Sequence, residues 1–145
     1  MITEFQKAIE AMLEAHNLLE WFYSGKKFYA RLDHPYFDRL EIERKGRTVT
    51  VGRYFIHQDD KLSDPEAEFH IQSLQADSSQ PWIPLVITKY LGEERERFTG
   101  PNGEIPAEEN IPPEAAAFLS NWAKEILAQR WARRATLITS RWSEE

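Results

Sequence analysis

The chain has 145 residues and a net charge of −6, and its mix of 41% hydrophobic and 29% charged residues predicts a single folded domain over residues 1–145. It contains no cysteine, which excludes disulfides, thiolate metal sites and cysteine nucleophiles. Because the N-terminus has no basic region followed by an apolar stretch, and no run of about 18 apolar residues occurs, we expect a cytoplasmic protein without a membrane segment.

The first predicted element is a helix over residues 3–23. Thr3 and Gln6 have the spacing of a capping box, in which a hydroxyl and an amide satisfy free N–H groups at the start of a helix. Apolar residues then recur at helical spacing, while charged residues occupy the outer face. Gly25 is expected to end this helix.

From Phe28 onward the apolar residues alternate with polar ones, which is typical of strands with one buried face. Lys45 and Gly46 predict a tight hairpin, and residues 58–65 are expected to form a polar loop. Pro84 cannot donate a hydrogen bond to a neighbouring strand, so its strand is expected at a sheet edge. The five predicted strands lie near residues 28–32, 40–43, 48–57, 66–74 and 82–91.

Residues 99–113 contain too many glycines and prolines for regular structure. A helix is expected to start near Pro113 and can run past Trp131, although β-branched residues weaken the helical pattern beyond Arg134. This order predicts the α+β class: a five-stranded antiparallel meander flanked by an N-terminal and a C-terminal helix. Both helices should cover one sheet face, which leaves the other face to solvent or a partner.

Three stretches of the chain resemble a family of small bacterial domains encoded on plasmids, phages and conjugative elements. They are DDKLSDPEAEF (residues 59–69), WIPL (82–85) followed by LG (91–92), and AFLSNWAKEILAQ (117–129). The resemblance spans about residues 46–131. The family has no assigned activity, so it implies no functional residues. It implies only a setting on mobile elements, where accessory and anti-defence proteins are common.

An acidic cluster is the most conspicuous candidate site. Several carboxylates can hold a hard cation, and together with histidine they can hold a transition metal. The spacing matches no calcium loop, however, so a solvated loop and strand face is favoured over a metal site or a loop that contacts a partner. The cluster comprises Asp59, Asp60, Asp64, Glu66 and Glu68, bracketed by His57 and His70.

A second pattern is typical of metal-dependent nucleases. Asp33 directly follows the first predicted strand, and Glu43 and Lys45 fall on one face of the next strand. In such enzymes carboxylates hold Mg²⁺ while a lysine stabilises the attacking water or the scissile phosphate. Because any exposed strand of alternating charge gives the same pattern, the ordinary surface interpretation is favoured.

The C-terminal segment carries a basic and aromatic cluster in an otherwise acidic chain. Aromatic rings can stack on bases and arginines can hold phosphates, so single-stranded nucleic acid is one possible ligand. Core packing with helix-dipole compensation is the favoured alternative, and a protein interface is the third. The candidate residues are Trp122, Arg130, Trp131, Arg133 and Arg134, followed by Arg141 and Trp142.

No nucleophile elbow and no glycine-rich phosphate loop occurs in the sequence. With no convergent catalytic set and no cofactor motif, we expect a non-enzymatic protein-interaction or regulatory module, such as an accessory protein of a mobile element. Its partner would be another protein or a second copy, with no membrane involved. The alternative is a nucleic-acid-acting protein, either an Arg/Trp helix binder or a weak metal-dependent nuclease. A protein with a small-ligand pocket is a third class, which no sequence motif favours.

Overall fold

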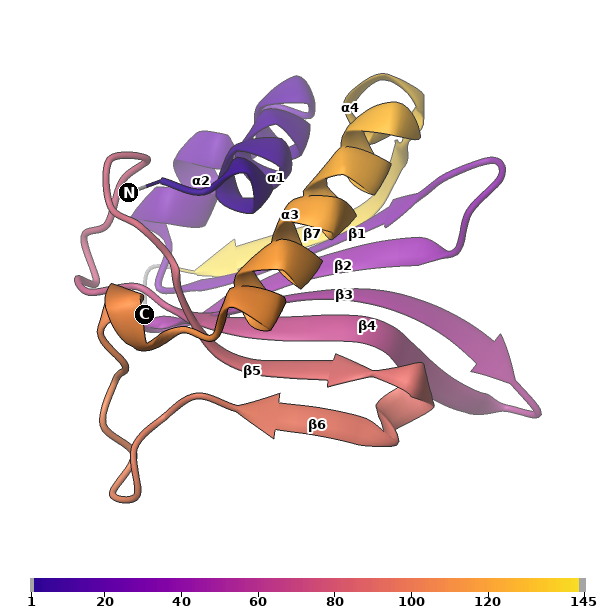
Figure 1. Ribbon diagram of the computed structural model, residues 1–145. Helices are drawn as coiled ribbons and strands as arrows, with labels where there is room; N and C mark the ends of the chain where they lie inside the picture. The colour runs from indigo at the N-terminus through magenta and orange to yellow at the C-terminus, as the bar shows by residue number, and fades with distance from the viewer. Residues whose placement is uncertain (1, 144–145) are drawn as a thin grey trace.

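The computed structural model describes residues 2–143, and its elements form two layers, a sheet and a set of helices on one of its faces (Figure 1). The helices come from both ends of the chain, and α1 packs against α3. They are α1 (Glu4–Ala15), α2 (Leu19–Ser24), α3 (Pro113–Ala128) and α4 (Trp131–Arg134), with 3₁₀ turns η1 (Tyr90–Gly92) and η2 (Glu108–Asn110).

The sheet is antiparallel, and its strands lie in the order β6-β5-β4-β3-β2-β1-β7. The first six strands follow one another as a meander, and β7 returns from the far end of the chain to pair with β1. The predicted α+β class and antiparallel meander are confirmed. The strands are β1 (Lys27–Asp33), β2 (Arg39–Lys45), β3 (Thr48–His57), β4 (Asp60–His70), β5 (Ile83–Lys89), β6 (Glu94–Arg97) and β7 (Thr136–Ser143).

The prediction of five strands is wrong, because the sheet has seven. The two missed strands are the edges β6 and β7, and neither buries an apolar stripe. All four residues of β6 are charged and exposed, and β7 is mostly exposed along its length. Edge strands of this kind resist pairing with other chains, but they lack the alternation that reveals a strand in a sequence. The helix expected to run from Pro113 past Trp131 is also interrupted: α3 ends at Ala128, Arg130 has a φ of 58°, and the short α4 ends at Arg134 before β7.

The expected edge position of Pro84 is also wrong, since β5 lies between β4 and β6. The β6 ladder, however, pairs with β5 only from Val86 to Lys89. Pro84 lies outside that paired stretch and is opposite Phe69 of β4, where the β4–β5 register shifts, and such an irregularity is a place where a strand tolerates proline.

The helix predicted over residues 3–23 is broken into α1 and α2. At the break Asn17 has a φ of 59°, a left-handed conformation that asparagine tolerates better than most residues. The change of direction lets α2 place Phe22 and Tyr23 in the core.

The loop predicted over residues 58–65 is largely strand. A two-residue turn at Gln58 and Asp59 joins β3 to β4, and both residues have positive φ, at 50° and 67°. Positive φ at both central residues is what a type I′ hairpin turn requires. The acidic stretch that follows therefore belongs to a long hairpin.

The core lies between the sheet and the helices. Alternate strand residues supply it, and Ala67, Phe69 and Ile71 point inward. Among the largest fully buried side chains are Trp131, Phe5, Phe22, Ile9, Met12 and Leu13. Within residues 2–143, no helix has the length and apolar character needed to cross a membrane.

Candidate binding site on the open sheet face

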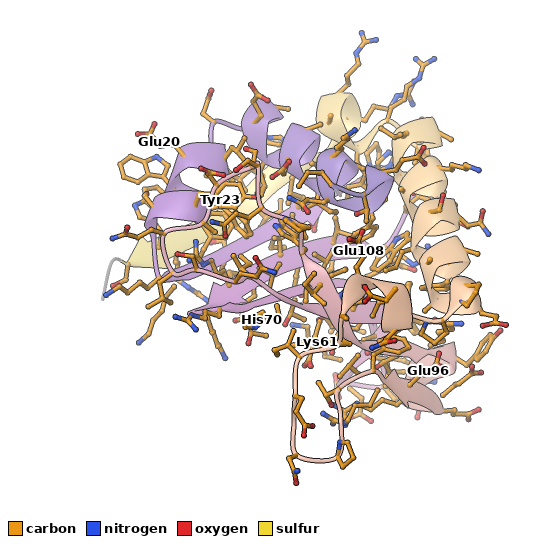
Figure 2. All side chains as sticks on the ribbon, turned by 60° about the vertical axis from the view of Figure 1, so that its left-hand side comes forward. Glu20, Tyr23, Lys61, His70, Glu96 and Glu108 are labelled. Carbon is orange, nitrogen blue, oxygen red and sulfur yellow. The ribbon has the colours of Figure 1, made fainter. Side chains whose placement is uncertain are left out.

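We call the sheet face opposite the helices the open face. Strand register sets its central rows, because residues paired across neighbouring strands point to the same side. In Figure 2, Tyr23 lies at α2 in the helical layer, whereas Lys61 and His70 lie at the sheet, away from the helices. Across β1, β2, β3 and β4, one central row consists of Arg31, Glu41, Gly52 and Glu66. The next row consists of Tyr29, Glu43, Thr50 and Glu68.

Gly52 makes room for an aromatic ring on this face. A Cβ atom at Gly52 would lie 2.4 Å from Cζ of Tyr54, so the ring lies directly over the glycine. The Tyr54 hydroxyl donates to Oε2 of Glu66, and Nζ of Lys61 lies 4.5 Å from the centre of the ring. A ring that covers a strand glycine also protects the backbone, so Tyr54 serves the sheet as well as the site.

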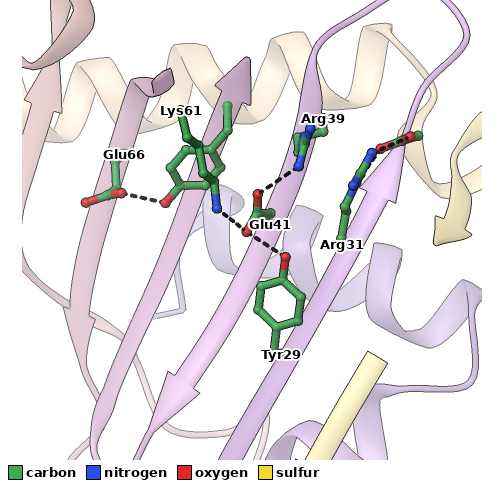
Figure 3. A network of polar contacts seen from close by, with 8 residues as sticks. Tyr29, Arg31, Arg39, Glu41, Lys61 and Glu66 are labelled. Carbon is green, nitrogen blue, oxygen red and sulfur yellow. Dashed lines mark hydrogen bonds and ion pairs between the residues drawn. The ribbon is translucent and has the colours of Figure 1, made fainter. Parts of the chain in front are cut away.

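Glu41 is the centre of the polar network (Figure 3). The Tyr29 hydroxyl donates to its Oε1 at 2.7 Å, and Nζ of Lys61 lies 2.9 Å from the same oxygen. Arg39 contributes a longer ion pair, with Nη1 at 3.8 Å from Oε2. Glu41 is only 5% exposed, although it stands on the face that the helices leave uncovered.

The side chains around Glu41 enclose a hollow of about 280 Å³. Within the described part of the chain, Oε2 of Glu41 receives no hydrogen bond. Leaving a buried acceptor unpaired costs about 1–3 kcal/mol, so this oxygen favours a donor from outside the chain. We call this cavity the Glu41 hollow, and it is lined by Tyr29, Glu41, Glu43, Thr50, Tyr54, Lys61 and Arg141.

Both tyrosines of the Glu41 hollow are held in their protonated form. Burial, together with the hydrogen bond to Glu41, raises the pKa of Tyr29 to about 12. Burial and the hydrogen bond to Glu66 raise the pKa of Tyr54 further. At neutral pH both phenols therefore act as hydrogen-bond donors rather than as bases, which suits binding more than proton transfer.

The acidic cluster singled out in the sequence is divided among three places. Asp59 and Asp60 are exposed at the tip of the β3–β4 hairpin. Asp64 faces the helical layer, where its carboxylate accepts the backbone N–H of Tyr90 at 3.1 Å. Glu66 and Glu68 lie on the open face and are half-buried. These five carboxylates therefore do not form one surface.

The residues of the nuclease pattern are also not brought together. Asp33 pairs with Arg31, whereas Glu43 lies opposite Tyr29, four residues earlier in β1 and so about 13 Å away. Glu43 and Lys45 do share the open face, with 3.7 Å between the charged groups. Among the residues that the structure describes, no three histidine or acidic side chains form a group able to hold a metal ion.

The basic and aromatic cluster separates in the same way. Trp122 and Trp131 are buried at 4% and 1% exposure, so their rings belong to the core and cannot stack on bases. The three arginines around α4, which are Arg130, Arg133 and Arg134, are exposed.

Sequence reasoning missed Glu41 as a site residue because a glutamate in an alternating strand is usually solvated. Gly52 was the available signal, since a glycine inside a β-branched strand indicates a bulge or a close approach. The reach of Lys61 and Arg141 across neighbouring strands depends on the strand register, which no local pattern shows.

No family model matches the chain, and neither a curated protein nor a solved structure matches it. The resemblance to domains of mobile elements therefore stays a prediction. Function has to be inferred from the geometry of the open face.

Proposed function

We propose that this protein is a non-enzymatic interaction module that binds a partner protein through its open face. In this proposal the Glu41 hollow receives an arginine side chain of the partner. The supporting observation is Glu41, a nearly buried carboxylate that lines the hollow and whose Oε2 accepts no hydrogen bond from residues 2–143.

The chemistry of the hollow favours a guanidinium group. The acidic groups that line the hollow are Glu41 and Glu43, which stand two residues apart on the same side of β2. Beyond the contacts of Glu41 already described, Glu43 has a 3.7 Å ion pair with Lys45. The planar guanidinium carries several N–H donors in a fixed fork and can contact two acceptors at once. A cavity of about 280 Å³ is below the usual size of drug-like sites and suits a single side chain.

The cations that line the hollow are already engaged. Lys61 is fixed between Glu41 and the ring of Tyr54, and Arg141 lies over the ring of Tyr29, 4.6 Å from its centre. These contacts hold the walls in place before binding, which reduces the entropy lost when a partner side chain enters.

The wider setting follows from the sequence. We place the protein in the cytoplasm as an accessory protein of a mobile element, which rests on the resemblance in residues 46–131 and on the composition. Regulation by occupancy of the open face suits such a protein, because it needs no chemistry of its own.

Calorimetric titration with short peptides tests this function. A peptide centred on arginine should bind, and the same peptide with citrulline, which keeps the shape but loses the charge, should bind at least tenfold more weakly. Glu41→Gln should reduce arginine binding by a similar factor. Glu43→Gln, on the same strand and face but more exposed, should have a smaller effect.

Two results would count against the proposal. They are equal binding of the arginine and citrulline peptides, and unchanged binding by the Glu41→Gln protein. If ultracentrifugation shows a dimer that Glu41→Gln converts to monomers, the partner is a second copy of the chain.

A further inference from the structure

A cationic groove lies at the end of the sheet where β1 begins and β2 and β7 end. It encloses about 680 Å³, which is within the range of ligand sites. Its lining is dominated by basic and aromatic side chains, although the chain as a whole is acidic. We call it the lysine groove, after Lys26, Lys27 and Lys45, which line it together with Tyr29, Arg141 and Trp142.

Two of the lysines oppose each other directly. Lys27 of β1 is the cross-strand partner of Lys45 of β2, and like charges at directly opposed positions destabilise a sheet. Within residues 2–143, no ion pair joins Lys26 or Lys27 to a carboxylate, and Lys45 has only the pair with Glu43 at 3.7 Å. A local arrangement that opposes stability is expected where function requires it, and a bound anion would relieve the repulsion.

An exposed aromatic pair borders the same groove. Trp142 of β7 stacks on Trp21 of α2, with 5.0 Å between the ring centres and 14° between the planes. The two rings are 42% and 39% exposed, in contrast to the buried Trp122 and Trp131. Exposed indole faces are good stacking surfaces for unpaired bases.

We propose that the lysine groove binds single-stranded nucleic acid. The phosphates would lie on Lys26, Lys27 and Lys45, and a base would stack on the Trp21–Trp142 pair. This second site goes beyond the proposed protein-binding function and uses neither Glu41 nor the arginines of α4. A single strand is favoured over a duplex because base pairing hides the faces that the indoles would contact.

Fluorescence anisotropy with a labelled 20-nucleotide oligothymidylate tests the proposal. The full-length protein should bind the single strand, and three phosphate contacts predict that log Kd rises with log salt with a slope of about 2. A duplex of equal length should bind at least tenfold more weakly. Trp142→Ala should weaken single-strand binding and reduce the quenching of tryptophan fluorescence that stacking produces.

The decisive variants are Lys27→Glu and Arg134→Glu, which change the net charge equally. Lys27→Glu should weaken binding at least tenfold while its melting temperature stays equal to or above that of the wild type, because the new glutamate faces Lys45. Arg134→Glu, on α4 and outside the groove, should bind like the wild type. Glu41→Gln should also bind oligonucleotide normally, so this proposal and the protein-binding proposal can fail separately.

The lysine groove would be excluded by any of three results. These are absence of single-strand binding at 50 mM salt, equal weakening by Lys27→Glu and Arg134→Glu, and duplex binding as tight as single-strand binding.

Discussion

Arg44 is a single buried charged residue that joins three separate parts of the fold. It is fully buried, and its guanidinium donates to backbone carbonyls of Phe22, Tyr23, Gly46 and Leu74 at 2.7–2.9 Å. Two of these carbonyls lie in the last turn of α2, where helices leave oxygens without partners. Arg44 therefore connects α2, the β2–β3 turn and the loop before β5.

Replacing Arg44 should be severe. Arg44→Met leaves buried carbonyls without donors, so we expect a loss of about 3 kcal/mol in the free energy of unfolding, measured by urea titration. Arg47→Met, at an exposed arginine three residues later, should change stability by less than about 0.5 kcal/mol. Similar losses in both variants would show that Arg44 has no special structural role.

Glu10 is another ionisable residue that the fold buries. The Tyr23 hydroxyl donates to its carboxylate, as does the side chain of Gln6, which also binds the backbone of Gln80 and Trp82. Burial raises the pKa of Glu10 above 4.5, although the hydrogen bonds from Tyr23 and Gln6 oppose this. The folded chain thus binds the proton more tightly than the unfolded chain.

The raised pKa of Glu10 determines whether the free energy of unfolding rises or falls with pH. The contribution of Glu10 to the free energy of unfolding should fall as the pH rises from 4.5 through the raised pKa. Glu10→Gln removes this fall, so the variant should gain stability relative to wild type between pH 4.5 and pH 7.5 in urea titrations. The exposed Glu20→Gln should show no such gain. A parallel pH profile for Glu10→Gln and wild type would refute the assignment.

At the scale of the element, β3 depends on the pairing of a glycine with a tyrosine. Gly52→Ala should push the Tyr54 ring off the strand and break its hydrogen bond to Glu66, at a cost of about 1–2 kcal/mol. In a Tyr54→Ala background the same change meets no ring, so it should be neutral or slightly stabilising. Thermal unfolding of the wild type, the two single variants and the double variant measures the coupling free energy between the two positions. Additive effects would show that the ring of Tyr54 does not depend on Gly52.

The strands and helices that could be predicted from the sequence are those that bury apolar side chains in the core. β1, β3 and α3 were found because alternating or helically spaced apolar residues face one core. β6 and β7 were missed because edge strands with exposed side chains carry no such period. The helix break at Asn17 was missed because a residue with positive φ interrupts the chain without changing the hydrophobic pattern.

Of the candidate site, only pairs of residues within one strand could be predicted. The sequence indicated that Glu66 and Glu68 share a solvent-facing side and that Glu43 and Lys45 share another, and both pairs lie on the open face. The Glu41 hollow requires residues from β1, β2, β3, β4 and β7 in one register. That register arises from tertiary pairing, which local patterns do not determine.

At the scale of the whole molecule, the two faces of the sheet are unequal. The helices cover one face (Figure 1). The other face combines a nearly buried carboxylate with a cationic groove at one end. The Glu41 hollow and the lysine groove share Tyr29, Glu43 and Arg141, so a partner on one site will lie beside the other.

A nuclear magnetic resonance titration with the arginine peptide can locate the surface on which the peptide binds. We predict that amide shifts concentrate at the Glu41 hollow, around Tyr29, Thr50 and Tyr54, and disappear in Glu41→Gln. Shifts confined to the helical layer, or an unchanged spectrum at millimolar peptide, would contradict the open face as the binding surface.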